Sequence, residues 1–363
     1  MNAGQIWWGQ IGNSLRFLSS VTNHLRDCHS AVLQVPQTVP WRQEFYDAID
    51  MRRTSFSGDR RLMRLSWDES TEPGEFVLVE LCSSRVRADY WPGQSYAEYL
   101  GSKEDIVLNE YYGWITGIHS KSGLAKWAEF VSQYESIAKK MDQAAVFLLE
   151  YDGVTVDVAG VEKIVYSMEN YDCRVFCLET AAALANSDSR SYQAELALSI
   201  GRGEPELCAA LLEKGRDLLE KPVETAQSVL QERSSSQGLR FAEMAEMEIE
   251  SAVWKAAVVL LFPILEQYRS DFIATHETEL ARHLPISNSN GDRITDPHDL
   301  EIGSIQYIVS NAKAGFSSSD VEMVKLCRKA RNLLAHNRIV PYQDIISISR
   351  LARESKTKGG VSL

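Results

Sequence analysis

The sequence predicts two domains of different class: an α/β domain, with a mostly parallel sheet and helices on both faces, followed by an all-α helical bundle. The chain has 363 residues, more than one ordinary domain core accommodates. Up to about residue 179, short apolar runs alternate with helix-like segments, whereas the last third shows only helical periodicity. A stretch rich in Ser and Gly, 234–241, separates the two parts and is expected to be a linker.

The first domain is expected to span 1–186. Short apolar runs rich in β-favouring residues predict strands, and apolar residues spaced three and four apart predict helices. The expected strands are 30–36, 61–67, 112–118, 145–151 and 173–178, and the expected helices are 13–28, 41–53, 76–90 and 124–141.

The rest of the chain has helical composition. Residues 187–233 predict a helical lid or connector, and 242–354 predict the terminal bundle, with helices at 301–312, 319–336 and 342–354. A long apolar stripe runs from Trp254 to Phe272, and Pro263 within it is expected to kink or divide the helix. A polar loop is expected at 285–299 and a mobile tail at 355–363.

Charge and cysteine usage narrow the class of protein. The net charge is −12, which argues against a broad phosphate-binding surface, and the acidity belongs to the first two thirds of the chain. The six cysteines lie mostly in apolar runs without the spacing of a disulfide framework, so reduced core thiols are expected. The chain shows no signal-peptide pattern and no long apolar run. A cytoplasmic protein without membrane association is therefore expected.

The first domain loosely resembles a P-loop NTPase of the AAA or STAND type, with 30–36 as the first strand and 145–151 as the Walker-B-like strand. The segment Gln34-Val-Pro-Gln-Thr-Val-Pro40 stands where the phosphate-binding loop belongs, but it lacks both the glycines and the lysine. We therefore expect no ATPase activity and no cofactor. Glu150 and Asp152 end a strand, where carboxylates either hold Mg²⁺ or, more often, are simply solvated.

Other metal signals are weaker still. Cys173 and Cys177 lie four apart on an expected strand, which makes a poor chelate, so core packing is the favoured interpretation. His24 and His29 flank Cys28 without matching ligands elsewhere, which favours surface or hydrogen-bonded roles. No metal site is therefore expected.

Seven of the eight tryptophans lie within the first 127 residues. Such residues usually fill cores, but one in a loop, as in Trp91-Pro92-Gly93, can anchor a partner. The acidic, Trp-rich first domain is therefore expected to sense a signal or to dock protein partners.

The expected helix 319–336 concentrates basic residues on one side. Its apolar face is predicted to bury Met323, Cys327, Ala330 and Leu334. The opposite face then carries a short positive patch in an otherwise nearly neutral domain: Lys325, Arg328, Lys329, Arg331 and Asn332.

The end of this helix brings a histidine and a polar residue together. Asn332 and His336 are four apart and share a face, while Arg331 lies about 100° round the helix from Asn332. Asn337 can adopt a left-handed cap and Pro341 cannot continue a helix, so His336 is expected in the final turn. The helix dipole favours positive charge at that position, which suits a proton-transfer group.

The hexapeptide Arg331-Asn332-Leu333-Leu334-Ala335-His336 resembles the R-polar-x3-H signature of the HEPN (higher eukaryote and prokaryote nucleotide-binding) superfamily. The resemblance covers about residues 242–353. It implies a metal-independent endoribonuclease, active as a homodimer, with Arg331, Asn332 and His336 as catalytic residues. RNA contacts are expected from Lys325, Arg328, Lys329 and Arg338, and the implied setting is bacterial antiviral defence or a toxin-like system.

Two interpretations remain open. Arg331 and His336 either act in RNA cleavage, or they are only a solvated helix end with a favourable dipole contact. In the second case the helices are a noncatalytic scaffold within a larger complex.

Overall fold

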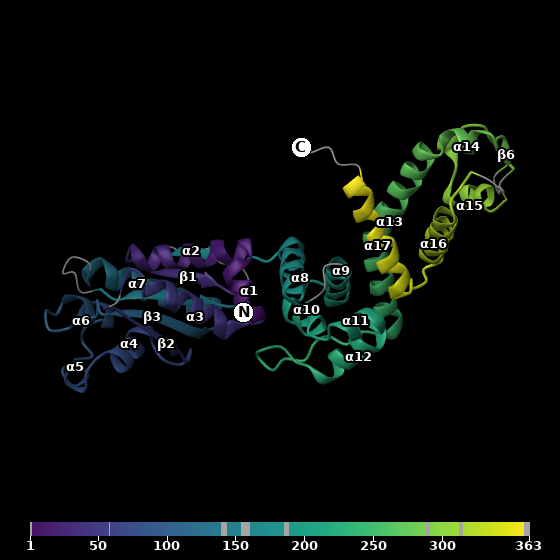
Figure 1. Ribbon diagram of the computed structural model, residues 1–363. Helices are drawn as coiled ribbons and strands as arrows, with labels where there is room; N and C mark the ends of the chain where they lie inside the picture. The colour runs from purple at the N-terminus through teal and green to yellow at the C-terminus, as the bar shows by residue number, and fades with distance from the viewer. Residues whose placement is uncertain are drawn as a thin grey trace. The chain divides into compact units, whose positions relative to one another are not determined.

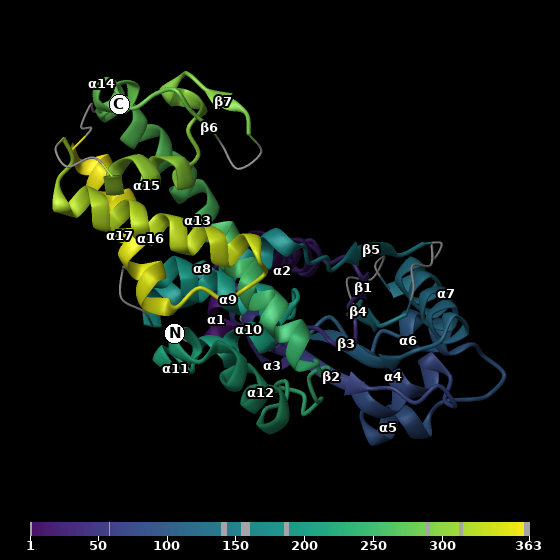
Figure 2. The ribbon, with the colours of Figure 1, turned by 90° about the vertical axis from the view of Figure 1, so that its right-hand side faces the viewer.

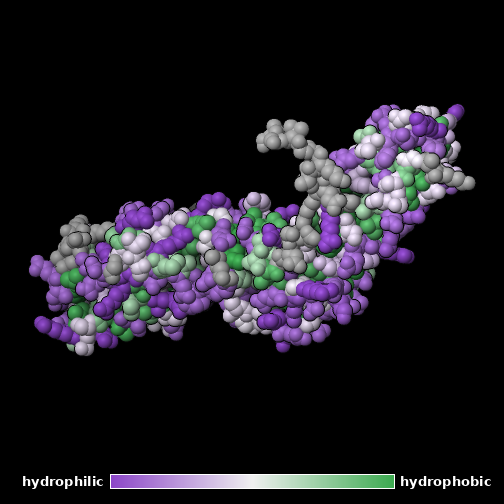
Figure 3. Space-filling model, viewed as in Figure 1, coloured by the Kyte–Doolittle hydropathy of each residue, from purple (hydrophilic) through white to green (hydrophobic). Residues whose placement is uncertain are grey.

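The computed structural model describes residues 2–57, 59–138, 144–153, 160–184, 189–287, 291–311 and 315–358, with side chains up to residue 350. The chain divides into two compact units, Met1–Asp172 and Cys173–Leu363 (Figure 1). Hydrophilic and hydrophobic residues are intermixed on the visible face of both units (Figure 3), as is usual for folded proteins.

The first unit is built around a five-stranded sheet in the order β2-β3-β4-β1-β5, in which all neighbouring strands are parallel. The strands are β1 (Ala31–Gln34), β2 (Arg61–Ser66), β3 (Tyr111–Ile118), β4 (Val146–Tyr151) and β5 (Glu162–Val165). In the central strand β4 every residue is buried, as expected for a parallel strand covered on both faces. The predicted α/β class, with a parallel sheet, is confirmed.

Alternate side chains of the strands pack against two separate layers of helices. Phe147 and Leu149 share a core with one layer, which contains α4 (Pro73–Leu81), α5 (Ser84–Ala88), α6 (Tyr96–Ser102) and α7 (Lys121–Ala138). On the other face, Trp114 meets Phe45 of α3 edge to face with ring centroids 5.1 Å apart. That layer contains α1 (Ala3–Gln10), α2 (Gly12–Arg26) and α3 (Arg42–Arg53).

Five of the seven tryptophans of this unit are buried in these two cores, and Trp41 is half-buried. Trp91 is the exception, because 78% of its surface is exposed. The expectation that most of these rings fill cores is therefore confirmed, and Trp91 is the exposed ring among them.

Two predicted elements of this part of the chain were wrong. The run 173–178 is not a strand but part of α8 (Asn170–Leu184), because a short apolar run is ambiguous and here the helical Ala-rich segment continues it. The fifth strand is instead β5, a four-residue edge strand whose mostly exposed residues give little apolar signal. The helix predicted at 76–90 is divided at Ser83, which caps α5 by accepting from the amide of Val86.

The second unit consists mainly of helices (Figure 2). They are α8 (Asn170–Leu184), α9 (Arg190–Gly201), α10 (Pro205–Leu212), α11 (Arg216–Glu220), α12 (Pro222–Glu232), α13 (Glu246–Thr275), α14 (Glu277–Ala281), α15 (Ile302–Asn311), α16 (Ser318–Ala335) and α17 (Tyr342–Lys358). The predicted polar loop contains a small hairpin of β6 (Ile286–Ser287) and β7 (Arg293–Ile294). A helical C-terminal region is confirmed.

The division of the chain differs from the expected one. The helices of the predicted connector, 187–233, belong to the same compact unit as the bundle, because α9 and α12 pack against α13. The predicted linker is not a free tether. Ser236 donates from its backbone and its hydroxyl to the carboxylate of Glu206 on α10, and Ser234 pairs with Arg240.

Helix α13 runs without interruption through Pro263, so of the two expected outcomes, a kink or a division, the division was wrong. Pro263 lies on the exposed side, near the 41%-exposed Val259, where water can satisfy the carbonyl that loses its amide donor. Helix α17 extends to Lys358, beyond the expected end at residue 354, and residues 359–363 of the predicted mobile tail lie outside the described part of the chain. None of the described helices combines the length and apolar character needed to cross a membrane.

Candidate functional site

Helix α16 carries the hexapeptide and is fixed at both ends. Its N-cap is Ser317, which forms a capping box with Asp320, so the cap lies two residues before the expected start. At the other end, Asn337 adopts φ 54°, and the amide of Arg338 donates to the carbonyl of Leu333 at 2.9 Å. This left-handed cap, which the sequence predicted, stops the helix directly after the motif.

The apolar face of α16 holds the helix in the bundle. Val324, Cys327, Ala330 and Leu334 are buried, so three of the four predicted residues are confirmed. Met323 is only half-buried, because the three-residue spacing of 324, 327 and 330 selects Val324 instead. The indole of Trp254 on α13 donates to the carbonyl of Leu334 at 2.9 Å, which ties the end of α16 to the long helix.

Arg331, Asn332 and His336 are all exposed, as predicted. Arg331 and Asn332 line a cavity of about 560 Å³ between α15, α16 and the β6–β7 hairpin, together with Arg328. His336 is not among the residues that line it; it is the C-cap of α16, one turn beyond Asn332. The structure therefore places Arg331 and Asn332 beside the same cavity, whereas His336 lies outside the cavity lining at the C-terminal end of α16.

The charges around this cavity are mixed. Arg293, Arg328 and Arg331 line it, and so do Asp292, Asp299 and Glu301. The guanidinium of Arg331 lies 3.6 Å from the carboxylate of Glu301, and both side chains are largely exposed. Arg293 and Glu301 could not be predicted from the sequence, because the hairpin that carries Arg293 and the start of α15 beside Glu301 reach α16 only through tertiary packing.

The four residues predicted to contact RNA do not form one patch. Arg328 lines the cavity and donates to the amide oxygen of Gln306 at 2.6 Å. Lys329 is directed to α17, where it lies 2.7 Å from Asp344. Lys325 and Arg338 are exposed. The basic residues of α16 therefore have different surroundings: Arg328 faces the cavity, Lys329 is ion-paired and Lys325 is exposed to solvent.

The carboxyl edge of the sheet in the first unit is a second cluster of polar groups. The buried carboxylate of Glu150 is ion-paired with Arg42 and accepts from the indole of Trp114 at 2.9 Å and from the hydroxyl of Tyr46. Asp152 accepts from Gln37 at 2.6 Å and pairs with Nδ1 of His119 at 2.7 Å.

These contacts perturb the residues around Glu150. Burial raises the pKa of Tyr46, and the negative charge of Glu150 raises it further. Burial alone would lower the pKa of Arg42, but Glu150 and Tyr46 outweigh it and raise it. Glu150 is therefore buried and bonded within the protein, so the solvated strand-end carboxylate favoured from the sequence was wrong. Among the described residues, no three His, Cys, Asp or Glu side chains are grouped to hold a metal ion.

The remaining sequence candidates are structural. Cys173 and Cys177 are fully buried on α8, and Cys173 donates to the carbonyl of Gly203, as their predicted packing role requires. His24 contacts Ser20 and Glu162, and His29 is exposed. Cys28 is only half-buried and is the exception among the six cysteines, none of which forms a disulfide.

No protein-family model matches this chain, and a search of curated proteins finds no relative.

Proposed function

We propose that the second unit is a metal-independent endoribonuclease of the HEPN type, in which Arg331, Asn332 and His336 are the catalytic residues. The observation that carries the proposal is that Arg331 and Asn332 open onto one cavity while His336 is exposed one helical turn away. The cavity is large enough for a nucleotide. The first unit would sense a signal or dock protein partners, for which the exposed Trp91 is the best anchor.

The chemistry follows from the properties of these side chains. His336 moves a proton as the 2'-oxygen of RNA attacks the adjacent phosphorus and the bond to the 5'-oxygen breaks. The planar fork of Arg331 neutralises charge that develops on the phosphate oxygens, and Asn332 orients the reacting groups. The products would be a 2',3'-cyclic phosphate and a free 5'-hydroxyl, and DNA would be spared because it lacks the attacking hydroxyl.

Homodimerisation is part of this proposal. One chain supplies one His336, whereas acid–base cleavage benefits from two proton-transfer groups. A symmetric dimer through the second unit would place two copies of the hexapeptide in one cleft. Light scattering of the full chain tests this point: a strict monomer at tens of micromolar would contradict it. A cytoplasmic setting in antiviral defence or a toxin-like system accords with these properties.

The decisive experiment compares wild-type protein and variants on single-stranded RNA, with candidate partner proteins present. His336→Ala and Arg331→Ala should abolish cleavage, and Arg331→Lys should fail as well, because an ammonium cannot reproduce the fork. Thermal midpoints should hardly change, since exposed substitutions usually cost less than about 0.5 kcal/mol. His283→Ala, which alters another exposed histidine of the same unit, serves as the matched control. Cleavage should survive EDTA.

The alternative function is a noncatalytic scaffold in a larger complex. The pairing of Arg331 with Glu301 and of Lys329 with Asp344 favours it, because one expected catalytic group and one expected RNA-contacting group already have protein partners. Equal cleavage by wild type and His336→Ala, or none by either, would put the scaffold ahead.

A further inference from the structure

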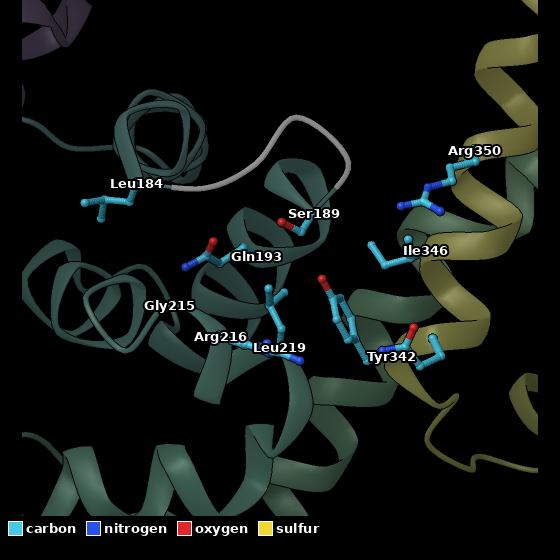
Figure 4. Close-up of a pocket in the computed structure, with 10 residues that line it drawn as sticks. Leu184, Ser189, Gln193, Gly215, Arg216, Leu219, Tyr342, Ile346 and Arg350 are labelled. Atoms are coloured by element: carbon cyan, nitrogen blue, oxygen red, sulfur yellow. The ribbon is translucent and has the colours of Figure 1, made fainter.

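Two cavities of the helical unit differ in how they relate to the hexapeptide. One, of about 370 Å³, lies between α9, α11 and α17, and the residues that line it include Arg216 and Arg350 (Figure 4). None of its described lining residues belongs to the hexapeptide. The other, of about 560 Å³, is the cavity beside α16, which Arg331 and Asn332 line. A substrate held at the hexapeptide therefore extends into the cavity beside α16.

The wall that α15 contributes to this cavity has an opening at a glycine. Gly303 and Tyr307 both line the cavity, and they lie four residues apart on the same face of α15. A Cβ at Gly303 would meet Nε of Arg328 at 3.9 Å, an ordinary van der Waals contact, and no other described atom within 4 Å. The surface of α15 at Gly303 is therefore open to the cavity.

An aromatic ring borders this opening on one side. Tyr307 is 64% exposed. Because the side chains of a helix point back toward its N-terminus, the ring of Tyr307 lies on the side of Gly303. Exposed aromatic rings on the wall of a cavity are surfaces on which unpaired nucleobases stack.

Arg328 of α16 borders the same opening. It donates to the amide oxygen of Gln306 at 2.6 Å, which fixes the guanidinium near Gly303. A guanidinium plane stacks on a nucleobase as an aromatic ring does. Asn332 lies one helical turn, about 5.4 Å, beyond Arg328 on the same face of α16. A base held at Arg328 would have its phosphate within reach of Arg331 and Asn332.

We infer that this opening binds one unpaired base of an RNA strand, between the ring of Tyr307 and the guanidinium of Arg328, with Gly303 as its floor. The inference rests on the proposed function in taking RNA as the ligand, but it does not require cleavage, because neither Tyr307 nor Gly303 takes part in the reaction. A base must leave its duplex partner to enter this site, so the site selects single-stranded RNA.

Binding of a 2'-O-methyl RNA oligonucleotide to the full chain, measured by fluorescence anisotropy, tests the site without cleavage, because the methyl group blocks the attacking oxygen. Tyr307→Ala should weaken binding about tenfold, the effect of removing one base–aromatic stack. Tyr307→Phe should stay within about twofold of wild type, because it keeps the ring. Tyr171→Ala, at a 71%-exposed position outside the cavity, is the matched control.

Gly303→Leu tests the opening itself. The added side chain fills the space in front of α15, so binding should fall at least about tenfold. The variant should fold at least as well as wild type, because leucine has a higher helix propensity than glycine. Gly9→Leu controls for an added leucine on a helix, since a Cβ at Gly9 of α1 would meet no described atom within 4 Å.

An oligonucleotide in which single bases are replaced by abasic residues shows whether a base is the group that binds. One such replacement should weaken binding to wild type about tenfold and leave binding to Tyr307→Ala unchanged, because the two changes remove the same contact. A duplex of the same sequence should bind at least about tenfold more weakly than the single strand. An abasic series in which no position matters would overturn the inference.

The outcomes distinguish this site from the proposed nuclease. If Tyr307→Ala and Gly303→Leu bound the oligonucleotide as wild type does, the base site would be wrong and the nuclease proposal would stand. If these variants bound weakly while His336→Ala cleaved RNA like wild type, the base site would stand and His336 would leave the mechanism. No binding of the single strand up to about 100 µM would overturn the base site.

Discussion

Charged side chains cluster both at the carboxyl edge of the sheet and at the end of α16, but they are buried and paired at the sheet edge and exposed at the helix end. At the sheet edge, Glu150 is buried and satisfied by Arg42, Trp114 and Tyr46. At the end of α16, Arg331 and His336 are exposed, and the contact of Arg331 with Glu301 is long. Charges that the protein satisfies internally maintain the fold, whereas exposed charges beside a cavity remain available to a ligand. Four predictions follow from this contrast, beginning with the largest expected effect.

Removal of the buried carboxylate should be the most damaging change. Glu150→Ala leaves Arg42 partly buried without its anion and leaves the indole of Trp114 without an acceptor. Breaking a buried pair in this way costs about 3–5 kcal/mol. Urea unfolding measures the loss, with Glu162→Gln, an exposed glutamate of the same sheet, as the control. A loss no larger than that of the control would mean that the network is not structural.

The bundle around α16 should lose stability in alkali. Burial raises the pKa of Cys327 from 9.0 to about 12. Because the folded-state pKa is raised, the contribution to stability is complete below pH 9 and is lost as the pH rises toward 12, at up to about 1.4 kcal/mol per pH unit.

Alkylation mapped by mass spectrometry checks this directly. At pH 9 the half-buried Cys28 should react with iodoacetamide well before Cys327. Equal rates at the two thiols would show that the bundle is open.

The hydrogen bond between α13 and the end of α16 should contribute an intermediate amount to the free energy of unfolding. Trp254→Phe removes the hydrogen bond to the carbonyl of Leu334 while keeping most of the ring. The expected cost is about 1 kcal/mol, measured by urea unfolding. Tyr307→Phe, at a 64%-exposed position, is the matched loss of a polar group and should be neutral. If Trp254→Phe left the free energy of unfolding unchanged, the hydrogen bond to Leu334 would not stabilise the end of α16.

The smallest change in stability is expected at the exposed ion pair. Glu301→Gln should alter the free energy of unfolding by less than about 0.5 kcal/mol, because exposed pairs contribute little. It should nevertheless tighten RNA binding by about threefold, since a negative charge beside Arg331 is removed. Glu277→Gln, on exposed α14, controls for the change in net charge. Weaker RNA binding by Glu301→Gln would mean that Arg331 needs this carboxylate for its position.

The sequence predicted most of what depends on local pattern. The buried run of β4 and the apolar face of α16 have clear periods, and Asn337 signalled the helix end. The strand predicted at 173–178 was wrong because a six-residue run with five apolar residues fits either a strand or a helix, and only packing decides.

Long-range features left no such trace. Glu301 lies thirty positions before Arg331 in the sequence, and the packing of α15 on α16 brings the two side chains together, so no spacing rule connects them. Glu206 orders the Ser-rich segment 234–241 from another helix, so composition alone suggested a linker. The cavity lined by Arg216 and Arg350 brings together residues of α11 and α17, which are far apart in the sequence, so no local pattern predicts it.

Because α13 is not broken at Pro263, the helical unit contains one long continuous helix. Its 30 residues extend about 45 Å. The helices that pack against it include α9, α12, α16 and α17. A tilt of about 5° at one end therefore displaces the other by about 4 Å, comparable with the rise of one helical turn. If α13 tilted as a rigid rod at the end that packs on α9 and α12, the end that packs on α16 and α17 would therefore move by about the length of a side chain.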